Sequence, residues 1–83
     1  MKLLFTRRAA SELMKMPKAD AKRVRDALQQ VADSHPQRMS FVTEMVGQPT
    51  YWRLRKGDWR AVYFIIEDEM AVVTVQKRGE VYE

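Results

Sequence analysis

The clearest pattern in the chain is a run of apolar residues at helical spacing between residues 18 and 34. This stretch holds neither glycine nor proline, and charged and amide side chains fill the intervening positions. Such a pattern predicts an amphipathic helix with one face on a core, and His35 and Pro36 are expected to end it. The apolar positions of this helix recur three or four residues apart: Ala21, Val24, Leu28, Val31 and Ala32.

Two shorter elements precede this helix. Residues 2–6 (KLLFT) are mostly apolar and predict a strand. Thr6 is a residue type that caps helices, and a second helix is predicted over residues 7–16, ended by Pro17. Its apolar positions at helical spacing are Ala10, Leu13 and Met14.

The second half of the chain is rich in aromatic and β-branched residues. Residues 36–50 show no constant period and indicate a connection that includes a short strand around residues 41–46. The turn sequences KGD and EDE then separate three predicted strands, residues 51–55, 59–66 and 70–76. Short connections make consecutive strands antiparallel neighbours. The predicted fold class is α+β, an antiparallel sheet with the N-terminal two-helix hairpin packed on one face, in the order β-α-α-β-β-β.

The hairpin at residues 51–63 (YWRLRKGDWRAVY) separates into two faces. A two-residue turn at Lys56–Gly57 places Arg53 directly opposite Arg60. Like charges directly opposite each other destabilise a strand pair, so the arginines indicate a function rather than a contribution to stability. The apolar side chains then point the other way, toward the helices: Trp52, Leu54, Trp59, Ala61, Tyr63 and Ile65.

Length and composition indicate one small globular domain. A chain of 83 residues cannot build two hydrophobic cores, so residues 1–83 are expected to form a single domain. The chain holds no cysteine, which excludes disulfides, thiol catalysis and cysteine-type zinc sites and fits a cytoplasmic location. No stretch approaches the roughly 20 apolar residues of a membrane span, so no membrane partner is expected.

The charge indicates a polyanionic partner. Lys and Arg number 15 against 11 acids, a net charge of +4. The pI of about 9.7 exceeds the value at which nucleic-acid binding is suspected. The alternative is a basic protein whose lysines only keep the surface hydrated, and clustering separates the two cases. The hairpin carries such a cluster, answered only by Asp58: Arg53, Arg55, Lys56 and Arg60.

The second half of the chain also carries a family pattern. Residues 51–82 (YWRLRKGDWRAVYFIIEDEMAVVTVQKRGEVY) resemble the C-terminal half of RelE/ParE superfamily toxins. These toxins share a hairpin of the form Y-x-[RK]-L-R-x-G-x-[YW]-R-x-x-Y and a late KR…VY tail. The predicted strand-helix-helix order of the first half agrees with their fold. The resemblance implies the toxin of a type II toxin–antitoxin system, most similar to RelE-like mRNA interferases.

The resemblance leaves three functions open. Members similar to RelE are ribosome-dependent endoribonucleases that cut mRNA, whereas members similar to ParE inhibit DNA gyrase without catalysis on nearly the same fold. An inactive member that keeps only its antitoxin interface is the third alternative. The RelE-like activity, our working hypothesis, implies as partners a cognate antitoxin protein, the ribosome and mRNA. DNA would be contacted only through the antitoxin complex.

RNA cleavage by attack of a 2′-hydroxyl on its neighbouring phosphate needs a base, an acid and positive charge on the transition state. It needs no metal and no cofactor. Position by position, the resemblance implies that Arg60 stabilises the transition state and Arg78 is the general acid. A guanidinium suits the first role better than the second, because it holds its proton tightly. Arg53 is implied to be the basic residue of the first hairpin strand, and Tyr82 to stack on or orient the nucleotide.

Around these four residues, Arg55, Lys56 and Lys77 are expected to bind RNA. Tyr51 departs from the family pattern, because the better-known enzyme has at this position a lysine thought to act as the base. Lys56, Lys77 and Glu80 are alternatives for the base, and nothing in the sequence ranks them.

Other features are interpreted as structural. Trp52 and Trp59 alternate within the predicted sheet and are assigned mainly to packing. His35 is expected to lie at a helix end, and the acids at 67–69 to form a solvated turn rather than a metal site. A group of basic residues either contacts ribosomal RNA on a second surface or is simply solvated: Arg7, Arg8, Lys15, Lys18 and Lys22.

Overall fold

The computed structural model describes residues 1–35, 37, 39–45 and 48–77. The α+β class agrees with the prediction, and the short strand expected around residues 41–46 is present, which adds a fourth strand after the helices to the predicted order β-α-α-β-β-β. In chain order the elements are β1 (Lys2–Phe5), α1 (Arg7–Lys15), α2 (Lys18–Ser34), β2 (Val42–Met45), β3 (Gln48–Lys56), β4 (Trp59–Ile66) and β5 (Glu69–Lys77).

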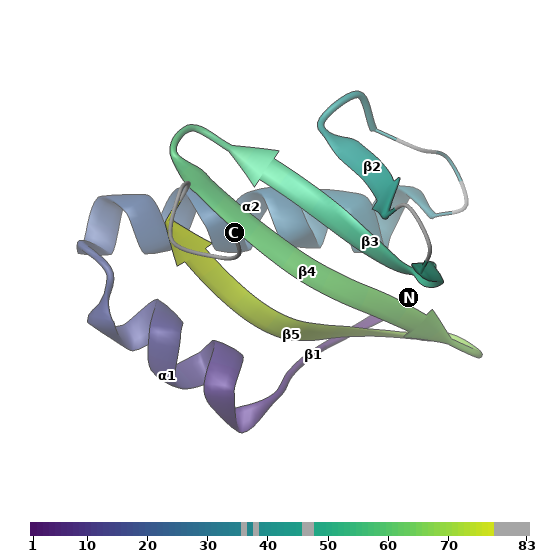
Figure 1. Cartoon of the computed structure of the whole chain (residues 1–83), viewed down its shortest axis with the longest axis horizontal. Coiled ribbons are helices and arrows are strands. Elements are labelled where there is room, and N and C mark those ends of the chain that lie inside the picture. Colours follow the sequence, from purple (N-terminus) through teal and green to yellow (C-terminus); the bar gives the residue numbers. More distant parts are fainter. Residues whose placement is uncertain (36, 38, 46–47, 78–83) are drawn as a thin grey trace.

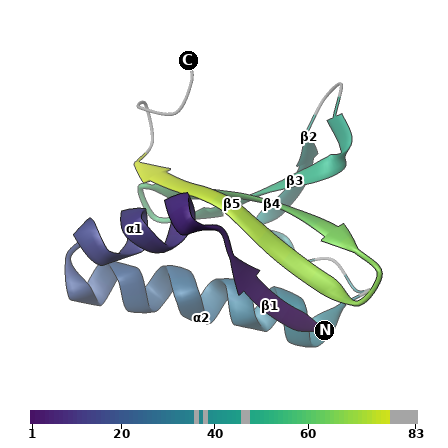
Figure 2. The same ribbon diagram turned by 90° about the horizontal axis from the view of Figure 1, so that it is seen from below.

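The five strands form one sheet in the order β1-β5-β4-β3-β2. Both helices lie on the same side of it, with α2 beneath the sheet and α1 beside β5 (Figure 1 and Figure 2). The expectation of a purely antiparallel sheet was wrong at one edge, because β1 pairs in parallel with β5. Short turns fix the directions of β3, β4 and β5, whereas the direction of β1 depends on the long return through the helical hairpin.

Helix α1 begins as predicted, but a different face is buried. The Thr6 side chain accepts a hydrogen bond from the Ala9 backbone N–H at 3.1 Å, which caps the helix. Ala9 and Leu13 are buried, whereas Ala10 is exposed and Met14 is 86% exposed. The helix has only nine residues, so a face through Ala9 and Leu13 and a face through Ala10 and Met14 have the same apolar spacing. The sequence pattern therefore does not decide which of the two faces is buried.

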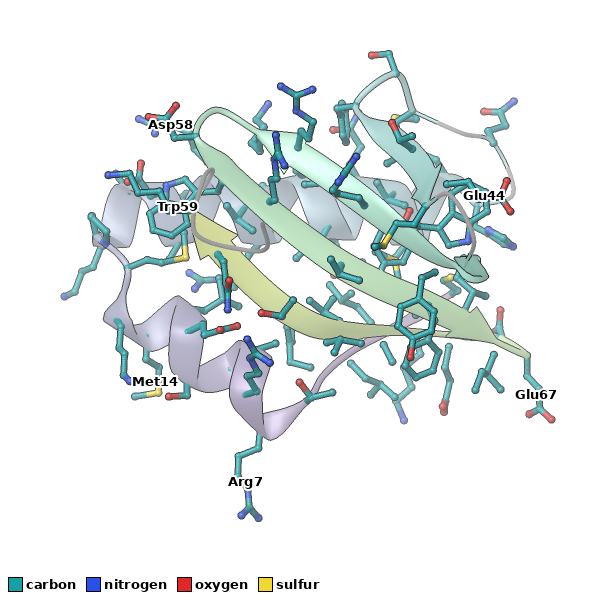
Figure 3. The ribbon with its side chains drawn as sticks, in the orientation of Figure 1. Arg7, Met14, Glu44, Asp58, Trp59 and Glu67 are labelled. Carbon is teal, nitrogen blue, oxygen red and sulfur yellow. The ribbon has the colours of Figure 1, made fainter. Side chains whose placement is uncertain are left out.

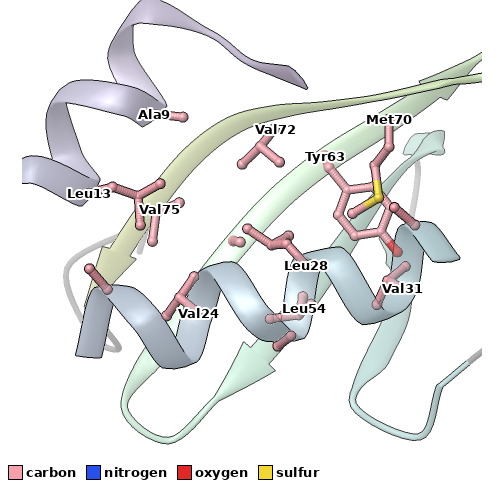
Figure 4. Close-up of a cluster of buried hydrophobic side chains, with 14 of the residues drawn as sticks. Ala9, Leu13, Val24, Leu28, Val31, Leu54, Tyr63, Met70, Val72 and Val75 are labelled. Carbon is pink, nitrogen blue, oxygen red and sulfur yellow. The ribbon is translucent and has the colours of Figure 1, made fainter. Parts of the chain in front are cut away.

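Helix α2 supplies most of the helical residues of the core. All of its predicted apolar positions are buried. They pack against the underside of the sheet, where Leu54, Tyr63 and Met70 are at most 1% exposed (Figure 4). Full burial of one such side chain stabilises the fold by about 1.5–3 kcal/mol. Neither of the helices that the structure describes is long and apolar enough to cross a membrane.

The β3–β4 hairpin turns at Gly57 and Asp58, between the paired residues Lys56 and Trp59, and not at Lys56–Gly57 as predicted. Gly57 has φ +59°, a value that suits the first position of a tight hairpin turn and that glycine adopts without a Cβ clash. The pairing therefore shifts by two residues, which leaves each side chain on its predicted face. The apolar face is confirmed by the buried residues Leu54, Ala61 and Tyr63 and by the partly buried Trp52, Trp59 and Ile65.

Candidate functional site

Three arginines share the sheet face that lies away from the helices. Arg55 is directly opposite Arg60, and Arg53 lies two residues further back on β3, opposite Val62. Diagonal neighbours of this kind are about 7–8 Å apart. The prediction that Arg53 and Arg60 face each other directly was therefore wrong, but the two arginines remain neighbours on one face. We call Arg53, Arg55 and Arg60 the arginine cluster.

The guanidinium groups of Arg53 and Arg60 are incompletely satisfied. The Nε atom of each is shielded from solvent and has no hydrogen-bond partner in the described part of the chain. The ion pairs found within residues 1–77, where described, join helix residues to each other and leave the arginine cluster without a counter-ion. A buried donor without an acceptor costs about 1–3 kcal/mol. The three guanidinium groups without a counter-ion favour binding of an anion with several acceptor oxygens on this face.

The two lysines predicted to bind RNA lie away from the arginine cluster. Lys56 and Lys77 both pair with Trp59, so all three side chains alternate toward the helix-covered face. The Lys56 Nζ lies 5.8 Å from the centroid of the Phe41 ring, within the range of a cation–π contact. The structure thus brings the three arginines together and sets the two lysines at the end of the sheet on its other side.

Two of the residues with implied catalytic roles, Arg78 and Tyr82, lie outside the described residues, as does the candidate base Glu80. Tyr51 is described, and it shares the face of the arginine cluster two positions before Arg53. The described part of the site is therefore a cationic sheet surface with an aromatic residue at its border, and the general base stays unassigned.

Glu12, which the sequence analysis did not single out, borders the same surface. Its Oε1 accepts hydrogen bonds from the Thr74 hydroxyl at 2.7 Å and from the Val75 backbone N–H at 2.8 Å. Its Oε2 accepts from the Gln76 amide at 3.0 Å and from the Arg8 Nε at 3.2 Å. One carboxylate on α1 thus receives four hydrogen bonds, three of them from consecutive residues of β5.

These bonds attach α1 to the sheet beside the arginine cluster. β1 pairs with β5 only as far as Val72, so the Val75 N–H has no partner on β1 and donates its hydrogen bond to Glu12 instead. Glu12 also accepts a hydrogen bond from Gln76, which pairs with Arg60 on β4. Burial of the Glu12 carboxylate raises its pKa, but the hydrogen bonds outweigh burial and hold the pKa below its ordinary value. A sequence signal existed, since Glu12 is the only acid before Asp20.

The acids at 67–69 mark the opposite end of β4 from the arginine cluster. Glu67 and Asp68 connect the paired residues Ile66 and Glu69 and are exposed, whereas Asp58 lies in the turn at the other end (Figure 3). Within the described ranges no three His, Asp or Glu side chains lie close enough together to hold a metal ion. The open face is therefore basic toward the β3–β4 turn and acidic at the β4–β5 turn.

Comparison with known proteins identifies the family. The family described as "ParE toxin of type II toxin-antitoxin system, parDE" matches residues 3–82. No curated protein sequence gives a significant match. The isolated RelE toxin of E. coli is similar in structure, with a TM-score of 0.79 and 26% identity, over 98% of this chain and 89% of that chain.

Two complexes contain chains of the same fold. A chain of the intact E. coli RelBE toxin–antitoxin complex gives a TM-score of 0.75 at 25% identity, over 95% of this chain and 96% of that chain. A chain of the RelB–RelE antitoxin–toxin complex of Methanococcus jannaschii gives 0.79 at 20% identity, over 95% and 94%. The family match takes in both the helical hairpin and the strands of the arginine cluster. The chain belongs to the ParE toxin family of type II toxin–antitoxin systems, within the RelE/ParE superfamily.

Proposed function

We propose that this toxin is a ribosome-dependent endoribonuclease that cleaves mRNA by attack of a 2′-hydroxyl on the adjacent phosphate and so inhibits translation. The observation that carries the proposal is the arginine cluster itself, three guanidinium groups on one sheet face with no ion-pair partner among the described residues. A phosphate supplies the missing counter-charge, and its charge increases in the transition state, where fixed guanidinium groups stabilise it most.

The proposed roles follow from position. Arg60 pairs with Arg55 on one side and with Gln76 on the other, so it lies between two strands that can contact the same phosphate, near the β3–β4 turn, and is assigned to the transition state. Arg53 would hold the same phosphate, and Arg55 would hold the RNA backbone. The remaining assignments rest on the family resemblance alone: Arg78 as general acid, Tyr82 for stacking on the nucleotide, Lys56 and Lys77 for RNA binding, and Lys56, Lys77 or Glu80 as the base.

The partners in this proposal are a cognate antitoxin protein, the ribosome and mRNA, all in the cytoplasm. DNA would be bound only through the antitoxin. The E. coli and M. jannaschii relatives were solved in complexes described as toxin–antitoxin complexes, which supports an antitoxin partner. We take residues 1–83 as one toxin domain, and the cleavage chemistry as one that requires neither a metal nor a cofactor.

The test is primer extension on cellular mRNA after brief induction of the toxin. The wild type should produce new 5′ ends at positions linked to codons, and Arg60→Ala should abolish them. Arg25→Ala is a charge-matched control, because Arg25 is exposed on α2, which lies beneath the other face of the sheet. Codon-linked cuts that persist in Arg60→Ala would show that the assignment of this site is wrong.

Gyrase inhibition without catalysis is the second candidate. It is favoured by the ParE description of the matching family and by Tyr51, which stands where the resemblance places a lysine base. A supercoiling assay with purified gyrase separates the two functions. The ribonuclease hypothesis expects no inhibition at toxin concentrations that support mRNA cleavage, and the gyrase hypothesis expects inhibition with no cleavage.

A further inference from the structure

Next to the arginine cluster, two aromatic side chains form a pair on the same sheet face. Tyr51 and Phe64 are directly opposite each other on β3 and β4, with ring centroids 5.7 Å apart and ring planes inclined by 42°. Neither ring is fully buried, and together with Ile65 and Ile66 they line a hollow of about 300 Å³. The pair stabilises the hairpin, but this does not account for an apolar hollow at the end of β4, which both rings border from the face opposite the core and Ile65 borders from the helix-facing side.

The aromatic pair is continuous with the arginine cluster. Tyr51 and Arg53 are two residues apart on one strand, so their side chains lie on the same face and their Cα atoms are about 7 Å apart. One of the two rings that line the hollow therefore belongs to the nearest neighbour of Arg53 along that face of β3. If a ligand binds Arg53 through an anionic group, the part of the ligand next to that group would lie against the rings of Tyr51 and Phe64.

The charge on the far side of the rings restricts what those atoms can be. Beyond Phe64 and Ile66, strand β4 ends in the acidic turn at residues 67–69. Those carboxylates repel a further phosphate, so the hollow suits an uncharged and flat part of the ligand. A nucleobase meets both conditions, because each base has a π-face that stacks on aromatic side chains.

We propose that Tyr51 and Phe64 form a platform for one nucleobase of the RNA whose phosphate lies on Arg53 and Arg60. The inference rests on the proposed function and deepens it, since it assigns a binding role to the position from which the expected lysine is absent. Stacking of one base on such a platform strengthens binding by about 5-fold to 100-fold.

The test measures binding to ribosomes programmed with a short mRNA that carries 2′-deoxy nucleotides in the A-site codon, which blocks cleavage. Each base of that codon is replaced in turn by an abasic nucleotide. One replacement should weaken binding of the wild type by about 5-fold to 100-fold. In Phe64→Leu and Tyr51→Leu, which keep an apolar side chain, the same replacement should change affinity by less than about twofold. Phe64→Tyr, which keeps an aromatic ring, should show the same loss of affinity on abasic replacement as the wild type.

Each contrary outcome has a distinct meaning. A wild type indifferent to all three abasic codons overturns the platform, and so does a Phe64→Leu variant with the wild-type ratio. If Phe64→Leu instead loses only co-purification with the antitoxin, the rings are a protein interface and the platform is again wrong. If Arg60→Ala binds the programmed ribosome as the wild type does, the proposed phosphate site fails separately from the platform.

Discussion

Arg55 and Arg60 face each other directly across the β3–β4 hairpin. Like charges in this position destabilise an antiparallel pair by about 0.2–1 kcal/mol relative to neutral residues. Within the described residues no acid forms an ion pair with either side chain. The two arginines therefore repel each other in the free protein. A phosphate bound by both guanidinium groups would replace this repulsion with two favourable interactions.

Arg55→Thr should therefore make the free protein more stable and its RNA binding weaker. Threonine suits a strand, and its introduction removes one of the opposed charges, so the free energy of unfolding should rise by about 0.2–1 kcal/mol in urea titrations. The slope of log affinity against log salt for RNA should become shallower by about 0.7. Lys77→Thr is the matched control, since Lys77 faces Trp59 rather than a cation, so any gain in stability should be smaller and come from the strand preference of threonine alone. A destabilised Arg55→Thr would contradict the repulsion.

The hydrogen bonds to Glu12 predict a dependence of stability on pH. Because the folded pKa lies below the ordinary value of 4.5, the carboxylate stabilises the fold fully above that value and loses this contribution as the pH falls through the folded pKa. Glu12→Gln should lower the free energy of unfolding by about 1–3 kcal/mol at neutral pH, since buried donors lose a charged acceptor. The difference from the wild type should shrink as the pH falls below 4.5 and through the folded pKa.

Asp26→Asn is the control for Glu12→Gln. Asp26 pairs with Lys22 at 2.9 Å on the surface of α2, where both side chains are well exposed. An exposed helical pair of this kind is worth about 0.3–0.5 kcal/mol. Urea titrations at neutral and acidic pH would measure both variants. If Glu12→Gln loses the same free energy of unfolding at both pH values, the charge of Glu12 does not contribute to the attachment of α1 to β5.

The sequence predicted best those parts of the fold that are determined locally. The apolar positions of α2 span several turns, and the strand alternation of residues 51–66 assigns Leu54 and Tyr63 to the core unambiguously. The parallel pairing of β1 with β5 was not predictable in this way, since it depends on where the helical hairpin returns the chain. The exact turn was missed because both KG and GD suit a two-residue hairpin turn, and the backbone places Gly57 first.

The candidate site was predictable only in its charge. Strand parity was sufficient to put Arg53, Arg55 and Arg60 on one face, and a two-residue shift of register left that conclusion intact. Glu12 stands out as an isolated acid, but its partners could not be named, because they lie on β5 more than sixty residues away in the sequence. The Tyr51–Phe64 contact likewise requires the register of β3 against β4.

Leu54→Ala should be among the most destabilising substitutions on the sheet. Leu54 is fully buried between β3 and α2, and its truncation leaves a cavity beneath the arginine cluster. The expected loss is about 2–5 kcal/mol in the free energy of unfolding. Met14→Ala removes a side chain of similar size that is 86% exposed, so it should change stability by less than about 0.5 kcal/mol. Equal effects of the two variants in urea titrations would contradict the assigned core.

The β4–β5 turn contains a strained residue that glycine should relieve. Glu67 has φ +55°, close to the +59° of Gly57 in the equivalent turn between β3 and β4. A side chain in this left-handed region costs about 1–2 kcal/mol, and glycine avoids that cost but loses about 0.5–1 kcal/mol in chain entropy. Glu67→Gly should therefore raise the free energy of unfolding by up to about 1.5 kcal/mol. Gly57→Ala, whose added Cβ would meet no atom within 4 Å, should lower it through backbone strain alone. Glu67→Gln removes the charge without changing the backbone preference, so a gain as large as that of Glu67→Gly would assign the effect to repulsion among the turn acids instead.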